Sequence, residues 1–151
     1  MKHARKLTSL LLALVMVFAL AVTVAADGTT GTTGTGSITI SNAAKGETYT
    51  IYKLFDATVS EDGKSIAYTG TVPDSLKTYF TADENGYISA TPAAKNGENM
   101  SDELKDALKA WTKGAKATAT AKSDGSALNF NGLAYGYYVV TTTQGNQVIS
   151  V

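Results

Sequence analysis

Two groups of carboxylates in the sequence have spacings that could support chemistry. The first is Asp56, Glu61 and Asp62, whose oxygens are the kind of ligand that calcium prefers. A calcium loop needs such ligands at closely repeated positions, and the turn at 60–63 is too short to provide them. We therefore interpret this group as a surface turn.

The second group, Asp102, Glu103 and Asp106, could serve as a carboxylate pair for glycoside hydrolysis. No further carboxylate is placed opposite it by the pattern of elements. Asp102 and Glu103 would lie at the start of a helix, where negative charge stabilises the positive end of the dipole. We expect them to stabilise a helix rather than to catalyse a reaction.

Lys53 lies in the strongest expected strand, 47–58. Because side chains alternate along a strand, Lys53 should share a face with Tyr49, Ile51 and Phe55. One interpretation is that its stem covers apolar surface while the ammonium reaches water. The other is a lysine placed to react with an asparagine side chain beside a buried acid, which forms an isopeptide cross-link. The strand pattern alone favours the first.

Other chemistry is limited because the chain has no cysteine and one histidine, His3. The lack of cysteine excludes disulfides. Once His3 is removed with the leader, Cys–His catalysis, Ser–His–Asp catalysis and the usual zinc ligand sets are also excluded. We expect no enzymatic activity, no cofactor and no metal site. Stability must come from the core, from partners or from another covalent link.

The first 26 residues have the order of a secretory signal peptide. Lys2, Arg5 and Lys6 precede an apolar run at 7–25, and small residues up to Ala26 offer a cleavage site. The alternative is a membrane anchor, since the run approaches the length that spans a bilayer. Cleavage is favoured by the polar, glycine-rich sequence that follows, and it predicts a secreted protein of the cell surface or cell wall.

Removal of this leader changes the charge of the chain. Its three basic residues leave ten Lys and Arg against 13 Asp and Glu, a net charge of −3. A mildly acidic surface argues against nucleic acid and against an anionic membrane as partners. The 125 residues that remain fit one domain with a modest core.

The pattern of elements predicts a mainly β fold with one inserted helix. Residues 27–36 are Gly and Thr with one acid, and are expected to be a flexible leader. Ser101 is a natural N-cap for a helix at 101–113, with Leu104, Leu108 and Trp111 on one face. Such a pattern predicts a Greek-key or immunoglobulin-like β-sandwich. Strands are expected at 37–41, 47–58, 65–70, 87–91, 117–123, 127–130, 136–143 and 147–151, with a short amphipathic piece at 75–80 and a loop at 92–100.

Two further features concern the helix and the end of the chain. Lys105, Lys109 and Lys113 share a helical face, which could bind an acidic partner but is interpreted as a solvated face. The last expected strand stops at Val151 without a closing turn, and an apolar edge of this kind favours aggregation. We therefore expect the domain at 37–151 to be truncated, with the reading frame continuing.

Two stretches of the sequence resemble the N-terminal domain of Gram-positive backbone pilins. The segment at 36–58 resembles the opening strands, with Tyr-Thr-Ile-Tyr-Lys-Leu-Phe at 49–55 as its centre. Gly-Leu-Ala-Tyr-Gly-Tyr-Tyr at 132–138 resembles the Leu-x-x-Gly-x-Tyr start of a late strand in these domains and in collagen-adhesin B-type sandwiches. The resemblance implies a structural subunit of a sortase-assembled pilus, whose partners are other pilin subunits, sortase and host surface ligands.

The sequence also departs from this family. The resemblance places the cross-linking lysine at Lys53, but the position of the catalytic acid is Thr142. The family's reacting asparagine lies in a final strand that is missing, and Asn129, Asn131 and Asn146 are better explained as strand-edge or turn residues. The Tyr-Pro-Lys segment and the Leu-Pro-x-Thr-Gly sorting signal are also absent.

We therefore expect Lys53 not to be cross-linked within this chain. The alternative function is an exported adhesin or carbohydrate-binding module. Its basis is the eight tyrosines and the tryptophan at 111, which could offer stacking surfaces.

Overall fold

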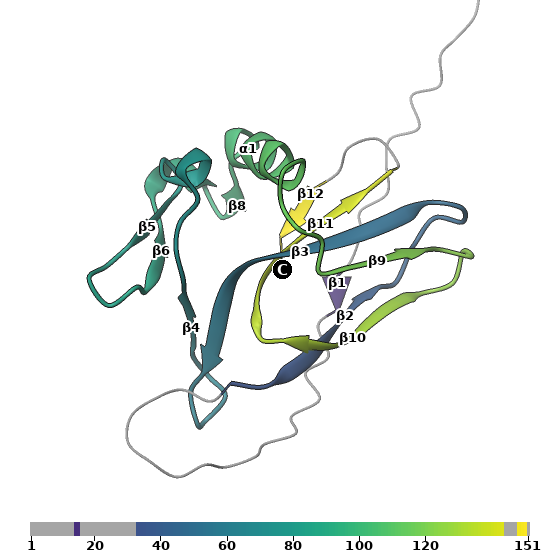
Figure 1. Ribbon diagram of the computed structural model, residues 1–151, viewed down its shortest axis with the longest axis horizontal. Helices are drawn as coiled ribbons and strands as arrows, with labels where there is room; N and C mark the ends of the chain where they lie inside the picture. The colour runs from purple at the N-terminus through teal and green to yellow at the C-terminus, as the bar shows by residue number, and fades with distance from the viewer. Residues whose placement is uncertain (1–13, 16–32, 144–147, 151) are drawn as a thin grey trace, which may run out of the picture.

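The long strand β3, Thr48–Val59, lies at the centre of the fold (Figure 1). β11, Gly136–Thr142, pairs antiparallel with one edge of it. The other edge is shared between β9, Ala119–Lys122, and β4, Ile66–Thr69. β12, Val148–Ser150, pairs with the far edge of β11. β3 is rich in β-branched and aromatic residues, which suit a pleated surface with neighbours on both sides.

The structure is a computed structural model that describes residues 14–15, 33–143 and 148–150. Most of the expected signal peptide, residues 27–32 of the expected leader, and Asn146 lie outside the described residues. No helix among the described residues is both long enough and apolar enough to cross a membrane.

A second antiparallel sheet contains β1, Leu14–Val15, β2, Thr35–Ile40, and β10, Leu128–Ala134, in that order. β2 begins at Thr35, so the last two residues of the expected leader at 27–36 belong to a strand. Gly34 and Gly36 allow the Tyr135 ring to pack closely on residues 34–36. A Cβ at Gly34 would lie 2.8 Å from the ring of Tyr135. The backbone nitrogen of Tyr135 donates to the Gly34 carbonyl at 2.9 Å.

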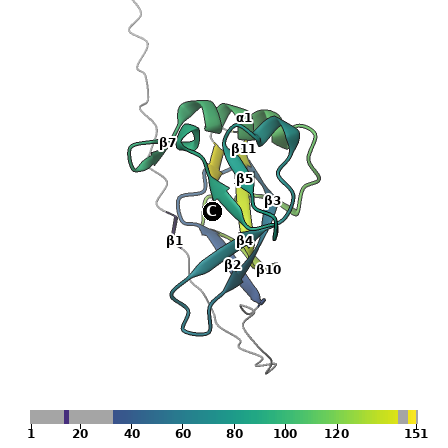
Figure 2. The same cartoon turned by 90° about the vertical axis from the view of Figure 1, so that its left-hand side faces the viewer.

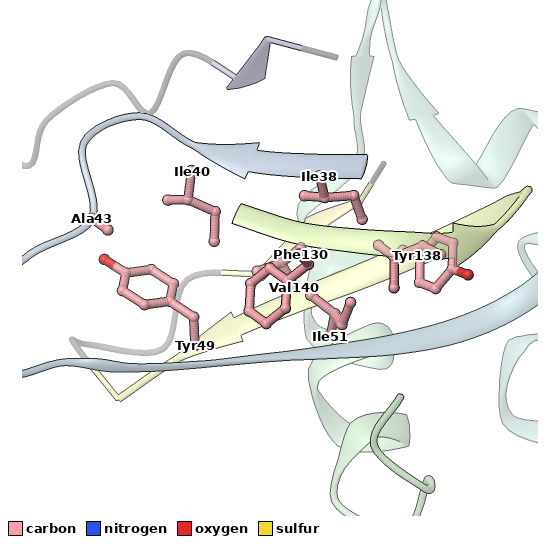
Figure 3. Close-up of a cluster of buried hydrophobic side chains, with 9 residues drawn as sticks. Ile38, Ile40, Ala43, Tyr49, Ile51, Phe130, Tyr138 and Val140 are labelled. Carbon is pink, nitrogen blue, oxygen red and sulfur yellow. The ribbon is translucent and has the colours of Figure 1, made fainter. Parts of the chain in front are cut away.

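The first hydrophobic core lies between the two sheets (Figure 3). Both sheets contribute alternate residues of their strands, as expected when one face of each is buried. Ile40 and Ile51 are fully buried there. The buried members of this cluster are Ile38, Ile40, Ala43, Tyr49, Ile51, Phe130, Leu133, Tyr138 and Val140.

The second hydrophobic core lies on the other face of β3 and β11. The helix α1, Asp102–Thr112, covers this face, opposite β2 and β10 (Figures 1 and 2). Leu104 and Leu108 of α1 pack in one cluster with Val139 of β11 and Phe55 of β3. The sheet of β3 and β11 is therefore the common wall of two cores.

The predicted helix at 101–113 is confirmed, with Ser101 as its N-cap. The Ser101 hydroxyl accepts from the Leu104 nitrogen at 3.2 Å and donates to the Ala93 carbonyl at 2.8 Å. Trp111 is half-buried and contacts the Tyr52 ring edge-on, with ring centroids 6.3 Å apart. The apolar face predicted from Leu104, Leu108 and Trp111 is the face that packs on the sheet.

Short elements connect β4 to α1, and here the prediction was partly wrong. The 3-10 turn η1, Asp74–Leu76, overlaps the start of the amphipathic piece expected at 75–80, and β5, Phe80–Ala82, begins at its last residue. The expected loop at 92–100 contains η2, Pro92–Ala94, and a tight hairpin of β7, Lys95–Asn96, and β8, Asn99–Met100. β5, Phe80–Ala82, and β6, Ile88–Ala90, form the remaining hairpin.

The predicted mainly β fold is confirmed: the sheets are antiparallel, and the described residues contain one α-helix.

Candidate functional site

Lys53 lies on β3 directly opposite Tyr138 of β11. Tyr49 and Ile51 lie in the first core, as predicted, but Phe55 lies in the second. The cause is a β-bulge: Tyr137 is opposite Phe55 while Tyr138 is opposite Lys53, which leaves Leu54 as an extra residue. The prediction that Phe55 shares the face of Lys53 was therefore wrong, because a bulge reverses the alternation that follows it.

The Lys53 side chain is 26% exposed and lies across Gly136. A Cβ at Gly136 would lie 2.6 Å from Lys53 Cε, so glycine is what allows this close approach. The ammonium forms an ion pair with the carboxylate of Asp56, which is 71% exposed. The backbone nitrogen of Lys53 donates to the Thr118 hydroxyl at 3.0 Å.

Tyr138 is the buried partner of Lys53 across the strands. Its hydroxyl points away from Ile51 and Val140 (Figure 3) and donates to the Ala134 carbonyl at 2.6 Å. Burial raises the pKa of Tyr138, and the negative charge of Asp56 adds to this increase. Tyr138 thus ties the start of β11 to the end of β10.

Thr142, the position that corresponds to the family's catalytic acid, lies far from Lys53. It pairs with Tyr49, four residues before Lys53 on β3, which corresponds to about 13 Å along a strand. The charged group next to the Lys53 ammonium is instead the carboxylate of Asp56. The structure therefore does not bring together the two positions that the resemblance pairs.

The late asparagines lie elsewhere. Asn129 is exposed on β10 and accepts a hydrogen bond from the Thr39 hydroxyl at 2.7 Å. Asn131 is exposed at the register shift between Phe130 and Leu133. Among the described residues, no hydrogen bond joins either asparagine to Lys53.

The two carboxylate groups lie at separate surface positions. In the hairpin between β3 and β4, Asp62 accepts from the Ser60 hydroxyl at 2.5 Å and the Lys64 nitrogen at 3.1 Å. These hydrogen bonds, chiefly that of Ser60, lower the Asp62 pKa. Glu61 is exposed beside them. In residues 33–143, no group of three or more His, Cys, Asp or Glu side chains could hold a metal ion.

On α1, Asp102 accepts from the Lys105 ammonium at 2.8 Å. This hydrogen bond and the charge of Lys105 lower the Asp102 pKa. Glu103, Asp106 and Lys113 are exposed, and Lys109 is half-buried. One of the three lysines of the expected basic face is thus engaged by a carboxylate of the same helix.

A cleft that is open to solvent adjoins Tyr138, the cross-strand partner of Lys53. Its walls come from β2, the β3–β4 hairpin and the turn between β10 and β11, and include Ile38, Val59, Tyr68 and Tyr138. Ile66, which is 48% exposed, also lines it. The sequence does not predict this cleft, because the cleft forms only where three distant segments meet.

Comparisons with known proteins add no family assignment. A scan against protein-family models finds no match for the chain, and a search of curated proteins finds no similar sequence.

Proposed function

We propose that the chain is an exported structural domain of a sortase-assembled pilus. The main support is the pairing of the two stretches that resemble backbone pilins, 49–55 and 132–138. They are far apart in the sequence, yet β3 and β11 are neighbours and Lys53 lies opposite Tyr138. These two strands, the lysine strand and the Leu-x-x-Gly-x-Tyr strand, are the elements on which the resemblance to backbone pilins rests.

We further propose that the two sheets form an immunoglobulin-like Greek-key sandwich. Two observations support this classification. The first core is built from both sheets. The Tyr138 hydroxyl bonds to the backbone four residues upstream, as the tyrosine corner of such sandwiches does. The α1 layer on the outer face is then an insertion into the sandwich.

A structural role agrees with the chemistry around Lys53. Its ammonium is ion-paired with Asp56, and its stem fills the space above Gly136. The stem packs β3 against β11, and the ion pair lies within β3. In this proposal the domain contributes to a pilus by its fold and surfaces, and covalent links between subunits are formed by sortase.

The proposal is tested by tagging the complete natural gene product in its source cell and examining cell-wall digests on denaturing gels. A ladder of covalent multimers that disappears when sortase is deleted is expected. A single band of monomer size in the wall fraction, unchanged by sortase deletion, would contradict it. N-terminal sequencing of the released protein should begin at Asp27, after the predicted cleavage at Ala26.

The second candidate function is a binding module, and the cleft beside Tyr138 favours it. Tyr68 and Tyr135 line it, and aromatic side chains are common in the walls of small-ligand pockets. Binding of the purified protein to a glycan array, lost in Tyr68→Ala but retained in Tyr87→Ala, would support this function. Tyr87 is the matched control because it is 50% exposed and is not among the cleft residues.

A further inference from the structure

Three Asn-Gly dipeptides occur in the chain, at 85–86, 96–97 and 131–132. In this dipeptide the glycine nitrogen can attack the side-chain amide carbon of asparagine, because no Cβ obstructs the approach. The amide leaves as ammonia and a five-membered succinimide ring forms. Water then opens the ring at either carbonyl, which gives aspartate or isoaspartate. The three sites have the same dipeptide, but the structure gives them different backbone hydrogen bonds.

Asn85–Gly86 is held in a hydrogen-bonded turn. The Gly86 nitrogen, which would have to attack, donates to the Asp83 carbonyl at 3.0 Å. The Asn85 nitrogen donates to the Asp83 carboxylate at 2.9 Å. The Gly86 carbonyl accepts from Gly70 at 3.2 Å. Rotation of the Gly86 nitrogen toward the Asn85 side chain would break at least one of these bonds.

Asn96–Gly97 lies in a much less constrained turn. The β7–β8 hairpin has only two pairs, Lys95 with Met100 and Asn96 with Asn99. Residues 95–99 are all exposed. Among the described residues, the Gly97 nitrogen donates no backbone hydrogen bond outside the β7–β8 ladder, and the Asn96 side chain makes no hydrogen bond.

Asn131–Gly132 is intermediate between these two. Both residues are exposed, and Gly132 has a φ of 68°. They lie within β10, however, with Phe130 paired to Ile38 on one side and Leu133 paired to Gly36 on the other. Both residues lie at the register shift of β10, so the nitrogen can turn toward the side chain only as far as the two flanking pairs allow.

We propose that Asn96 is the site at which the folded protein undergoes spontaneous deamidation. The balance is one water consumed and one ammonia released for each asparagine converted. Each event adds one negative charge to the hairpin beside Glu98. The isoaspartate product also inserts a methylene group into the main chain between residues 96 and 97.

The position of the hairpin gives the modification a structural consequence. Residues 94 and 101 flank it, and the Ser101 nitrogen donates to the Ala94 carbonyl at 2.9 Å. Ser101 also caps α1, and Ala94 is buried in the second core. A lengthened main chain at residue 96 disturbs the pairing of Asn96 with Asn99, which lies next to this cap. The hairpin therefore connects a surface reaction to the start of α1.

The test is to incubate the purified full chain at mildly alkaline pH in ¹⁸O-labelled water and to map the deamidated peptides by mass spectrometry. In the native protein, Asn96 should convert roughly tenfold faster than Asn85, the difference expected from breaking one or two hydrogen bonds at Gly86. In denaturant the two rates should become similar, since both sites have the same dipeptide. Gly97→Ala should slow conversion at residue 96 and leave residue 85 unchanged.

Several results would overturn this assignment. Equal native rates at Asn85 and Asn96 would show that the turn hydrogen bonds do not protect residue 85. A native rate at Asn96 far below its rate in denaturant would show that the hairpin prevents the attack. Fastest native conversion at Asn131 would place the site in β10 instead.

Discussion

At residue scale, the contacts of Lys53 determine its expected reactivity. An amine attacks an amide only as the neutral base, and the ordinary pKa of lysine is about 10.4. The reaction also needs an acid that shares a proton with the amide. The Lys53 ammonium is engaged by the exposed Asp56. Thr142 lies on β11 opposite Tyr49, four residues before Lys53 on β3. The local geometry thus favours an ion pair over a cross-link.

We therefore predict that Lys53 forms no isopeptide bond within this chain. Intact-mass measurement should give the mass calculated from the sequence of the chain. A deficit of one ammonia would indicate a bond to asparagine, and a deficit of one water a bond to aspartate. Either deficit, if abolished by Lys53→Ala, would contradict the prediction.

Gly136 is the second residue whose role follows from close contacts. A Cβ there would lie 2.6 Å from both Lys53 Cε and the Phe55 carbonyl oxygen. The lysine can move, but the carbonyl belongs to a central strand. Gly136→Ala should therefore lower the free energy of unfolding by about 1–3 kcal/mol, as overpacking does.

Denaturant unfolding measures this change, with Gly114→Ala as the matched control. No atom lies within 4 Å of the Cβ position at Gly114, so that variant should be nearly neutral. Equal stability of the two variants would show that the β3–β11 junction tolerates a side chain at Gly136.

At element scale, α1 depends on the cap at Ser101. The Ser101 hydroxyl accepts from Leu104 and also donates to the Ala93 carbonyl, so it joins the helix to the preceding turn. Ser101→Ala should lower the free energy of unfolding by about 1 kcal/mol. Ser101→Asp should recover part of this loss because it retains an acceptor for the helix nitrogen.

The control for the Ser101 variants is Ser89→Ala. Ser89 is exposed on β6, and no side-chain hydrogen bond is recorded for it among the described residues. Denaturant unfolding should show little change in this variant. A loss in Ser89→Ala equal to that in Ser101→Ala would argue against a capping role.

The elements that the sequence predicted well are those with a strong local pattern. β3 and β11 are long runs of aromatic and β-branched residues, and α1 has a cap, a first-turn charge and an apolar face. The β7–β8 hairpin was missed because two-residue strands are too short to show an alternation. The start of β2 was missed because Gly34 looks like a linker residue until Tyr135, a hundred positions later, packs on it.

The candidate site was predicted less completely than the fold. The position of Lys53 on the face of Tyr49 and Ile51 followed from alternation, and its pairing with Tyr138 needed the β3–β11 register. The bulge at Leu54 has no local signal, because it depends on the partner strand. For the same reason the ion pair with Asp56 and the cleft could not be inferred from spacing.

At the scale of the whole molecule, exposed aspartates determine the response to acid. Four aspartate carboxyls have a pKa below the ordinary 3.8. Two are lowered chiefly by a hydrogen bond from a serine, Ser60 or Ser126. The other two are lowered by the hydrogen bond and the charge of a lysine, Lys77 or Lys105. A lowered folded pKa stabilises the fold above the unfolded pKa, and this stability is lost as pH falls through the folded pKa. The four carboxyls are Asp62, Asp74, Asp102 and Asp124.

We predict that the free energy of unfolding is nearly constant between about pH 5 and pH 8, where histidine is the usual titrating side chain and the chain has only His3. It should decline once the pH falls below about 4. The decline should be shallow, since all four carboxyls are exposed, and high salt should reduce the part that comes from Lys77 and Lys105. Urea unfolding across pH measures it. A stability that increases from pH 5 to pH 3 would contradict the assignment.

The common wall between the two cores leads to a prediction about cooperativity. Val139 and Val140 are neighbours on β11, but Val139 is buried in the second core and Val140 in the first. Each valine-to-alanine change should cost about 2 kcal/mol, from lost burial plus a small cavity. Because the two valines are consecutive on one strand, the double variant should deviate from additivity by about 0.5 kcal/mol or more through their shared backbone.

If one sheet holds both cores together, neither core should unfold alone. Trp111 is the only tryptophan and lies at the edge of the second core, so its fluorescence reports the helix layer. Far-UV circular dichroism reports the sheets. In Val139→Ala and in Val140→Ala, the two signals should shift together to the same lower midpoint, as expected for a two-state domain. Val139→Ala tests this coupling more directly, because the cavity that it creates lies beneath α1. An early fluorescence transition confined to that variant would show that the helix layer detaches from a sheet pair that remains folded.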